Sequence, residues 1–217
     1  RNLWAGLHTD LLRVGIGTYD RWFGPGRYGG LMLTDNGRPA PLGSAAIEGR
    51  VFERYGRARA EIGAGWLDGF RGDVHAPGWL LMDFRWAPVP ALELGATRMG
   101  LFGGSGRPAP QVGQLILPTQ PHIEGDQDQD LPDQDEIAAL DARVTLPLGK
   151  WVGRSGTPGT GFGIDYLELY TQYGGEDVIA RKIASIPVPA LAGIANLFGG
   201  EVGVGDLVLT IEHSRVL

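Results

Sequence analysis

The chain has 217 residues, a net charge of -6 and no cysteine. The missing cysteines exclude disulfides, thiolate metal ligands and a cysteine nucleophile, and the negative charge argues against a nucleic-acid partner. The 36 glycines fit a fold with many tight turns better than a disordered chain, since 43% of the residues are hydrophobic.

Alternation of apolar and polar residues predicts about ten β-strands, because side chains on a strand point to opposite faces in turn. The first clear case is residues 12–19, in which Leu12, Val14 and Ile16 share one face. The other clear candidates are residues 46–54, 59–66, 79–86, 92–99, 137–146, 163–173, 191–198 and 206–213. Turns are expected at 87–91, 174–177 and 199–205.

Residues 21–41 carry the most distinctive pattern of the chain. Trp22-Phe23-Gly24-Pro25-Gly26 precedes an apolar run, and Asn36-Gly37-Arg38-Pro39 follows it. Gly and Asn permit positive φ and Pro fixes φ, so the pattern predicts a strand, a tight turn, a short strand and a loop. Residues 24–29 also match G-x-G-x-x-G, but Gly29-Gly30 and the β-like run after them cannot begin the helix that a dinucleotide site needs.

A long connection is expected at residues 103–136, and its second half is acidic. Asp126, Asp128 and Asp130 suggest calcium, but the central Gly and the closing Glu of an EF-hand loop are missing. A solvated acidic loop is therefore the plainer interpretation, and a weak divalent-cation site is the alternative. The four histidines show no ligand spacing, so no metal site and no cofactor are predicted.

Charged residues recur on one face of nearly every predicted strand. They are Arg13, Arg59, Glu61, Asp83, Arg85, Glu93, Asp141, Arg143, Glu168 and Glu212. This pattern fits either the solvated face of a soluble sandwich or the polar lumen of an outer-membrane barrel. The tryptophans at 22, 66, 79, 86 and 151 fall at or beside predicted strand ends, which favours the aromatic girdles of a barrel.

Residues 21–41 resemble the signature of the capsule assembly protein Wzi family. Three later segments, at residues 92–107, 140–147 and 169–177, are similar to the family as well and follow in its order. The resemblance implies a bacterial outer-membrane protein without catalytic activity. Such a protein assembles or retains capsular polysaccharide or exopolysaccharide at the cell surface in a lectin-like way. Outer-membrane lipid and polysaccharide export machinery are the further partners that it implies.

Candidate polysaccharide-binding residues are aromatic, amide and charged side chains that can stack on sugars or hydrogen-bond to them. They are Arg21, Trp22, Asn36, Arg38, Tyr170, Gln172, Glu176 and Asp177. For each residue a role in the turn or the girdle is the simpler interpretation. Catalysis is not expected, because Glu176 and Asp177 are adjacent and glycosidases need two carboxylates across a bond.

We therefore expect an all-β fold, an antiparallel transmembrane outer-membrane β-barrel. Residues 1–217 would form a single domain, a large segment of a bigger barrel truncated at both ends. Residues 103–136 and the Gly-Gly-Glu-Asp turn would face outward and residues 87–91 the periplasm, since such barrels keep their short turns on that side. A porin-like channel and a soluble β-sandwich carbohydrate-binding protein are the alternatives.

Overall fold

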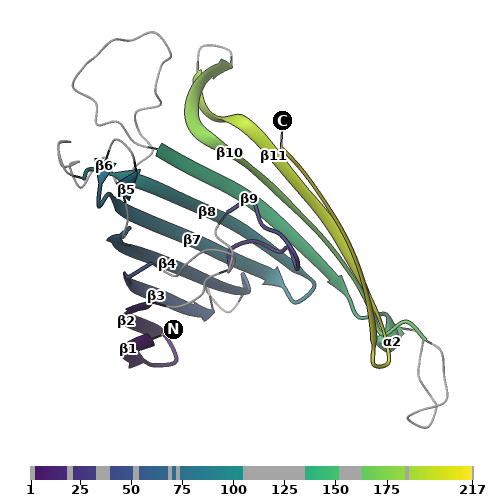
Figure 1. Cartoon of the computed structure of the whole chain (residues 1–217). Coiled ribbons are helices and arrows are strands. Elements are labelled where there is room, and N and C mark those ends of the chain that lie inside the picture. Colours follow the sequence, from purple (N-terminus) through teal and green to yellow (C-terminus); the bar gives the residue numbers. More distant parts are fainter. Residues whose placement is uncertain are drawn as a thin grey trace.

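The computed structural model describes residues 3–18, 22–32, 40–50, 54–67, 70–71, 74–104, 135–151, 163–183 and 186–216. Ten strands form one antiparallel sheet, and each strand pairs with its neighbours in chain order (Figure 1). The prediction of an antiparallel all-β fold is therefore confirmed. β1 and β12 lie at the two edges of the sheet, and no pairing joins them within these ranges.

The strands of this sheet follow one another as an up-and-down meander. They are β1 (Leu3–His8), β2 (Leu12–Thr18), β3 (Leu42–Arg50), β4 (Arg57–Trp66), β7 (Gly78–Val89), β8 (Leu92–Phe102), β9 (Asp135–Leu146), β10 (Tyr166–Ile183), β11 (Ile186–Val204) and β12 (Leu207–Val216). A second, two-stranded sheet of β5 (Phe70–Arg71) and β6 (Val74–His75) lies between β4 and β7. A short helix, α2 (Leu148–Trp151), follows β9.

The meander gives the sheet two unlike ends. At the short-turn end, β1 joins β2, β3 joins β4, β7 joins β8 and β11 joins β12 through two to six residues each, and the connection from β9 to β10, residues 147–165 with α2, is the long exception at this end. At the long-loop end, the connections after β2, β4 and β8 are all longer, and the hairpin of β10 and β11 also turns there. The predicted turn at 87–91 is shorter than expected, because β7 continues to Val89.

One face of the sheet is apolar and open to its surroundings, and we call it the outer face. It carries the alternate residues of each strand, such as Ile16 on β2, Phe84 on β7, Leu140 on β9 and Ile211 on β12. Leu140 is 61% exposed and Ile211 70%. A contiguous apolar surface of this kind is not left in water by a folded soluble domain, so it indicates contact with another apolar phase.

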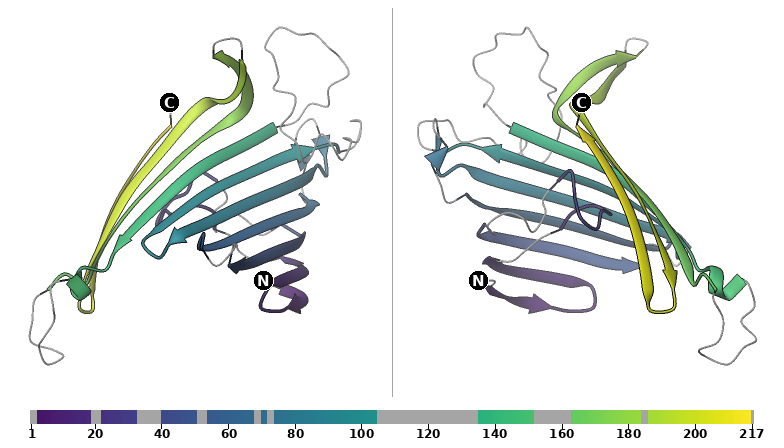
Figure 2. Two further views of the ribbon diagram at one scale, coloured as in Figure 1. Left: turned by 180° about the vertical axis from the view of Figure 1, so that it is seen from behind. Right: turned by 45° about the vertical axis from the view of Figure 1, so that its right-hand side comes forward.

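The opposite, inner face is the concave side of the curved sheet (Figure 2). Large side chains there lie flat across neighbouring glycines. A Cβ at Gly199 would come within 2.2 Å of the Tyr170 ring, and one at Gly203 within 2.1 Å of the Tyr166 ring. These glycines therefore serve close packing inside a strand.

Two predicted turns are wrong, and this packing accounts for the second of them. Residues 174–177 continue β10, which runs unbroken to Ile183, with a register shift beside Glu176. Residues 199–204 continue β11, and the turn that follows is only Gly205 and Asp206. In β11, Gly199 and Gly203 are covered by the inner-face rings of Tyr170 and Tyr166, so this stretch has the residues of a turn without forming one.

Residues 22–32 also differ from the prediction. They contain no strand, and they fold back as an irregular segment over the inner face. Phe23 packs there with Leu42, Trp79 and Leu81, which together form the buried apolar cluster of the described chain. The prediction that Trp79 belongs to an aromatic girdle is wrong, because its side chain is 3% exposed within this cluster.

Candidate functional site

The charged residues that alternation assigned to one face do lie together on the inner face, and most of them are paired. Arg13 reaches across β3 to Glu61 on β4, with 3.0 Å between Nη2 and Oε2. Arg59 pairs with the same carboxylate. The Glu61 side chain is 1% exposed, so two guanidiniums compensate a carboxylate that water scarcely reaches.

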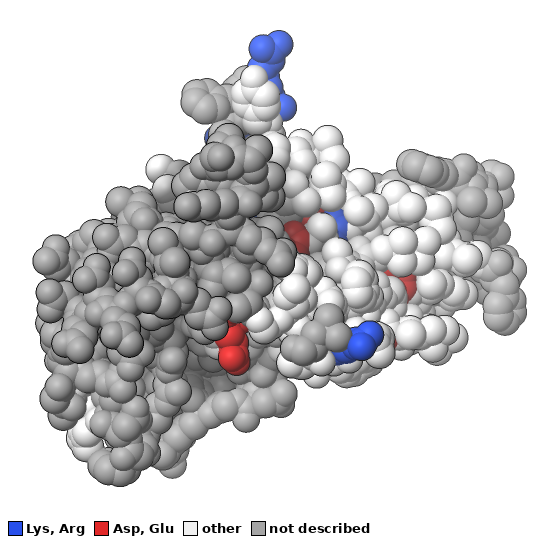
Figure 3. Space-filling view, turned by 90° about the horizontal axis from the view of Figure 1, so that it is seen from above, with Lys and Arg blue, Asp and Glu red and all other residues white. Residues whose placement is uncertain are grey.

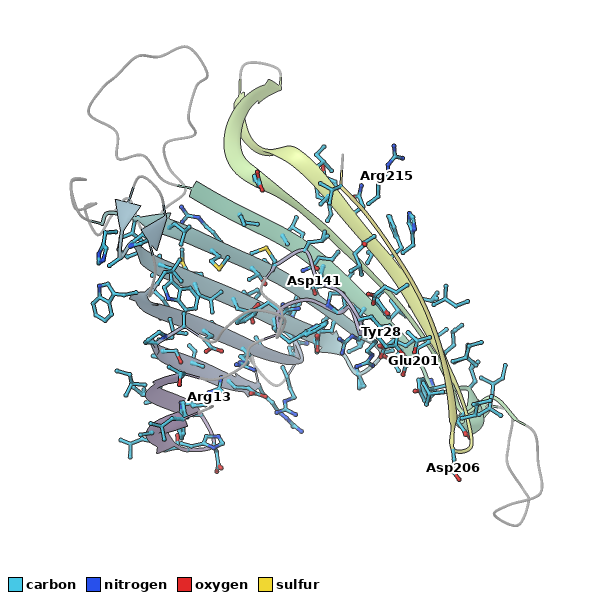
Figure 4. The ribbon with its side chains drawn as sticks, in the orientation of Figure 1. Arg13, Tyr28, Asp141, Glu201, Asp206 and Arg215 are labelled. Carbon is cyan, nitrogen blue, oxygen red and sulfur yellow. The ribbon has the colours of Figure 1, made fainter. Side chains whose placement is uncertain are left out.

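A second network is centred on Arg85 of β7. Its Nη1 donates to Asp141 Oδ1 at 2.6 Å, and its Nε donates to Asp83 Oδ1 at 3.0 Å. The Thr97 hydroxyl donates to Asp83 at 2.7 Å and accepts from Arg85 at 3.2 Å. The network crosses β7, β8 and β9, and Figure 4 labels Asp141 at its far side and Arg13 at the other end of the inner face.

The folded-back segment, residues 22–32, is held to β10, β11 and β12 by Arg27. Its Nη2 donates to Glu168 at 2.9 Å, its Nε lies 3.2 Å from Glu201, and its backbone N–H donates to Glu212 at 2.8 Å. Tyr166 donates to Glu201 and Tyr170 donates to Glu212, so these aromatic hydroxyls orient the carboxylates. Charge-assisted bonds of this kind are stronger than neutral ones.

Gln172 makes a third attachment for the segment. Its Oε1 accepts a hydrogen bond from the Leu31 backbone N–H at 3.0 Å. Gly24, with a φ of 110°, lies so close that a Cβ there would be 2.5 Å from the Gln172 amide nitrogen. Only glycine meets both the backbone conformation and the lack of space.

A hollow of about 520 Å³ lies between the segment and the inner face. Its walls come from the halves of β2, β3, β4, β7 and β8 that lead to the short-turn end, and from residues 22–24 of the segment. The lining residues are Arg13, Trp22, Phe23, Gly24, Glu48, Arg57, Ala58, Arg59, Glu61, Asp83, Arg85, Ala87 and Glu93. This volume lies within the range of about 300–1,000 Å³ that is usual for ligand sites.

The predicted polysaccharide-binding residues fall into three groups. Trp22 forms part of the wall of the hollow. Tyr170 and Gln172 are buried beneath the segment and hold it. Glu176 is exposed on β10 towards the long-loop end, and Asp177 is the next residue of that strand.

The remaining candidates lie outside the described residues. They are Arg21, Asn36 and Arg38, together with the possible calcium ligands Asp126, Asp128 and Asp130. Within the part of the chain that the structure describes, no group of three or more His, Asp or Glu side chains could hold a metal ion. No helix of that part is long and apolar enough to cross a membrane.

Sequence reasoning missed several residues of the inner face. The role of Arg27 could not be predicted because the three glutamates that it contacts lie 141 to 185 residues later in the chain. Glu201 was hidden within the Gly-rich stretch that predicted a turn. Continuing the alternation of β11 through that stretch would have placed Glu201 on the charged face, opposite Glu168.

Comparison with known proteins gives one family. The model of the capsule assembly protein Wzi family matches residues 2–209. Neither the curated proteins nor the solved structures contain a match to the chain.

Proposed function

The chain belongs to the capsule assembly protein Wzi family, and we propose that its long-loop end is the surface that holds the polysaccharide. Proteins of this family are bacterial outer-membrane β-barrels and non-catalytic lectins. They bind capsular polysaccharide and take part in assembling the capsule and retaining it at the cell surface. The outer-membrane location rules out the soluble sandwich that the alternating pattern of the strands had left open.

The single observation that carries the proposal is the contrast between the two faces of the sheet. The apolar outer face suits the hydrocarbon of a bilayer, and the paired charges of the inner face suit an enclosed interior. With the strands across the membrane, the short-turn end is periplasmic and the long-loop end is external by the usual rule for such barrels. Outer-membrane lipid is then the partner of the outer face.

The long-loop end offers the polymer an extended surface. The ladder between β9 and β10 ends at Glu176, whereas β10 and β11 continue as a two-stranded ribbon as far as Ile183 and Ile186. Figure 3 looks onto the molecule from above, and charged side chains are sparse on the described surface there. Long polymers are held through many weak contacts, so an extended surface favours retention.

Within this proposal the predicted residues have different roles. Glu176 and Asp177 are the proposed contacts of the polymer at the long-loop end. Arg21, Asn36 and Arg38 lie outside the described residues and are proposed as contacts from their residue types alone. Tyr170 and Gln172 act indirectly, by fixing residues 22–32 on the inner face. Docking of export machinery remains a prediction.

The test uses the full-length protein in cells that lack their own copy. Cell-attached and released polysaccharide are measured for a variant with Glu176→Gln and Asp177→Asn, and for Arg38→Ala. Attached polysaccharide is expected to fall, because each change removes a group that can bond to sugar hydroxyls. Asp206→Asn is the matched control, since Asp206 lies exposed in the turn at the opposite end (Figure 4).

Two results decide the matter. Retention that falls in the variant with Glu176→Gln and Asp177→Asn or in Arg38→Ala, and not in Asp206→Asn, supports the proposal. Unchanged retention in all variants, with normal amounts of folded protein in the outer membrane, would refute this placement of the polymer. Conductance in planar bilayers distinguishes a porin-like channel from a lectin, because an open lumen would pass ions.

A further inference from the structure

We propose that the hollow beside Trp22 is a second saccharide site, at the periplasmic end of the barrel, for a neutral and hydroxyl-rich sugar chain. This inference rests on the proposed function only in taking a saccharide as the ligand and the short-turn end as periplasmic. It concerns a different site, at the other end of the strands from the external polymer surface.

The charge of the lining indicates the class of ligand. Four arginines (Arg13, Arg57, Arg59 and Arg85) face four carboxylates (Glu48, Glu61, Asp83 and Glu93). Most of them are already paired with one another: Arg57 lies 2.8 Å from Glu48, and Arg13 lies 3.0 Å from Glu61. A site without excess charge gives neither anions nor cations a net attraction, so an uncharged ligand suits it.

The hydrogen-bonding groups of the lining indicate which kind of uncharged ligand suits the hollow. A guanidinium offers five N–H donors and a carboxylate offers only acceptors, so a wall that alternates the two presents both kinds at close spacing. A sugar hydroxyl donates and accepts at once, which lets vicinal hydroxyls bridge such pairs. Arg13 and Arg59 keep about a third of their side-chain surface exposed while pairing with Glu61, so donors remain for a ligand.

Trp22 supplies the apolar part of the site. It lies at the start of the folded-back segment, next to Phe23, which is anchored in the apolar cluster with Trp79 and Leu81. The anchoring fixes the backbone beside Trp22, so the indole is presented on a positioned segment. An aromatic side chain contributes a large apolar area with few rotatable bonds, which is how aromatic residues serve recognition of amphipathic ligands.

The position of the hollow gives the direction of approach. Arg57 and Ala87 lie beside the turns of the short-turn end, and their strands pair there. By the orientation rule for outer-membrane barrels, this end faces the periplasm. The ligand of the hollow is therefore a sugar chain that approaches from inside the cell envelope, before it reaches the external surface.

The experiment measures binding of oligosaccharides to the full-length protein in detergent by isothermal titration. The probes are hexamers of glucose, galactose and mannose, each with its uronic acid counterpart. At least one neutral hexamer is expected to bind more tightly than its uronate. Trp22→Ala should weaken that binding about tenfold, the loss of one good aromatic contact, whereas Trp22→Phe should keep most of it.

Two further variants make the test specific. Tyr28→Ala is the matched control, because Tyr28 belongs to the same segment but is 74% exposed and does not line the hollow. It should leave binding unchanged. Glu93→Gln leaves four arginines against three carboxylates, so it should improve uronate binding a few-fold while neutral binding changes little.

Each outcome has one meaning. Absence of binding by every neutral hexamer, tighter binding of the uronates, or an equal effect of Trp22→Ala and Tyr28→Ala would overturn the inference. Retention of polysaccharide by cells is measured with the same variants. If cells retain polysaccharide but the hollow binds no oligosaccharide, only this second site is refuted. If cells with the unaltered protein retain no more polysaccharide than cells that lack it, the proposed function is refuted.

Discussion

Replacing Arg27 with Ala should release the folded-back segment from β10, β11 and β12. The substitution removes both side-chain ion pairs, to Glu168 and to Glu201, and leaves those carboxylates inside the molecule. Each keeps one or more other partners: Thr145 donates to Glu168, and Tyr166 donates to Glu201. The segment keeps its other two attachments, through Phe23 and through Gln172.

The size of the effect follows from the exposure of the partners. Breaking a buried ion pair costs about 3–5 kcal/mol, and an exposed pair contributes about 0.2–1 kcal/mol. The Arg27 side chain is 41% exposed while both glutamates are at most 10% exposed. An intermediate loss of about 2 kcal/mol corresponds to a change of about 30-fold in the docking equilibrium, at about 1.4 kcal/mol per tenfold.

Amide hydrogen exchange of the full-length protein in detergent measures this loss directly. The amides of Arg27 and Leu31 donate to Glu212 and Gln172, so both should exchange about 30-fold faster in the Ala variant if they open with the segment. Arg27→Lys should give a smaller increase, because it keeps the charge but loses the planar fork.

The matched control is Arg57→Ala. Arg57 also pairs with a glutamate on the inner face, but the pair is exposed, 70% for the arginine side chain, and it joins β4 to β3 rather than the segment to the sheet. Exchange at Arg27 and Leu31 should be unchanged in this variant. Equal exchange in the Arg27→Ala and unaltered proteins, or an equal increase in Arg57→Ala, would show that Arg27 does not hold the segment.

Two other predictions concern the barrel itself, and heat-modifiable migration in gels measures both. Gly199→Ala should destabilise the fold by about 1–3 kcal/mol and so lower its unfolding temperature, since the added Cβ would meet the Tyr170 ring. In the control Gly43→Ala the added Cβ would have 3.8 Å of space, so the unfolding temperature should not fall. Equal behaviour of the two variants would contradict the packing argument. Leu140→Arg, in the middle of β9 on the outer face, should cost about 2–4 kcal/mol in a bilayer, whereas Val89→Arg at the end of β7 should cost at most about 1 kcal/mol. Equal folding of these two variants would mean that the outer face does not meet lipid.

The sheet could be predicted because alternation is a local property of the sequence. Leu12, Val14 and Ile16 show their common face without any knowledge of the rest of the chain, and β2 extends over Leu12–Thr18 as expected. The charges of β4, β7 and β9 were assigned to one face in the same way. Their pairing across strands then follows from the register.

The folded-back segment could not be predicted, because nothing local determines it. Trp22-Phe23-Gly24-Pro25-Gly26 has the residues of a turn, and its backbone does bend sharply at Gly24. Its position, however, depends on Glu212, Glu168 and Gln172, which are far away in the sequence. The role of Gly199 and Gly203 could not be predicted either, because it depends on contacts with Tyr170 and Tyr166 on the neighbouring strand.

The inner face itself argues for a lectin scaffold rather than a selective pore. Selective pores keep rings of charge available to permeating ions, whereas here Glu61, Asp83 and Asp141 are each bonded to an arginine and are nearly inaccessible to water. Residues 22–32 cross this face from the Phe23 cluster to the carboxylates of β10, β11 and β12, and so cover part of the surface that would line a lumen. Charges that are already satisfied make the interior a rigid support, and a rigid support keeps binding surfaces in place at no further loss of conformational entropy when a polymer binds.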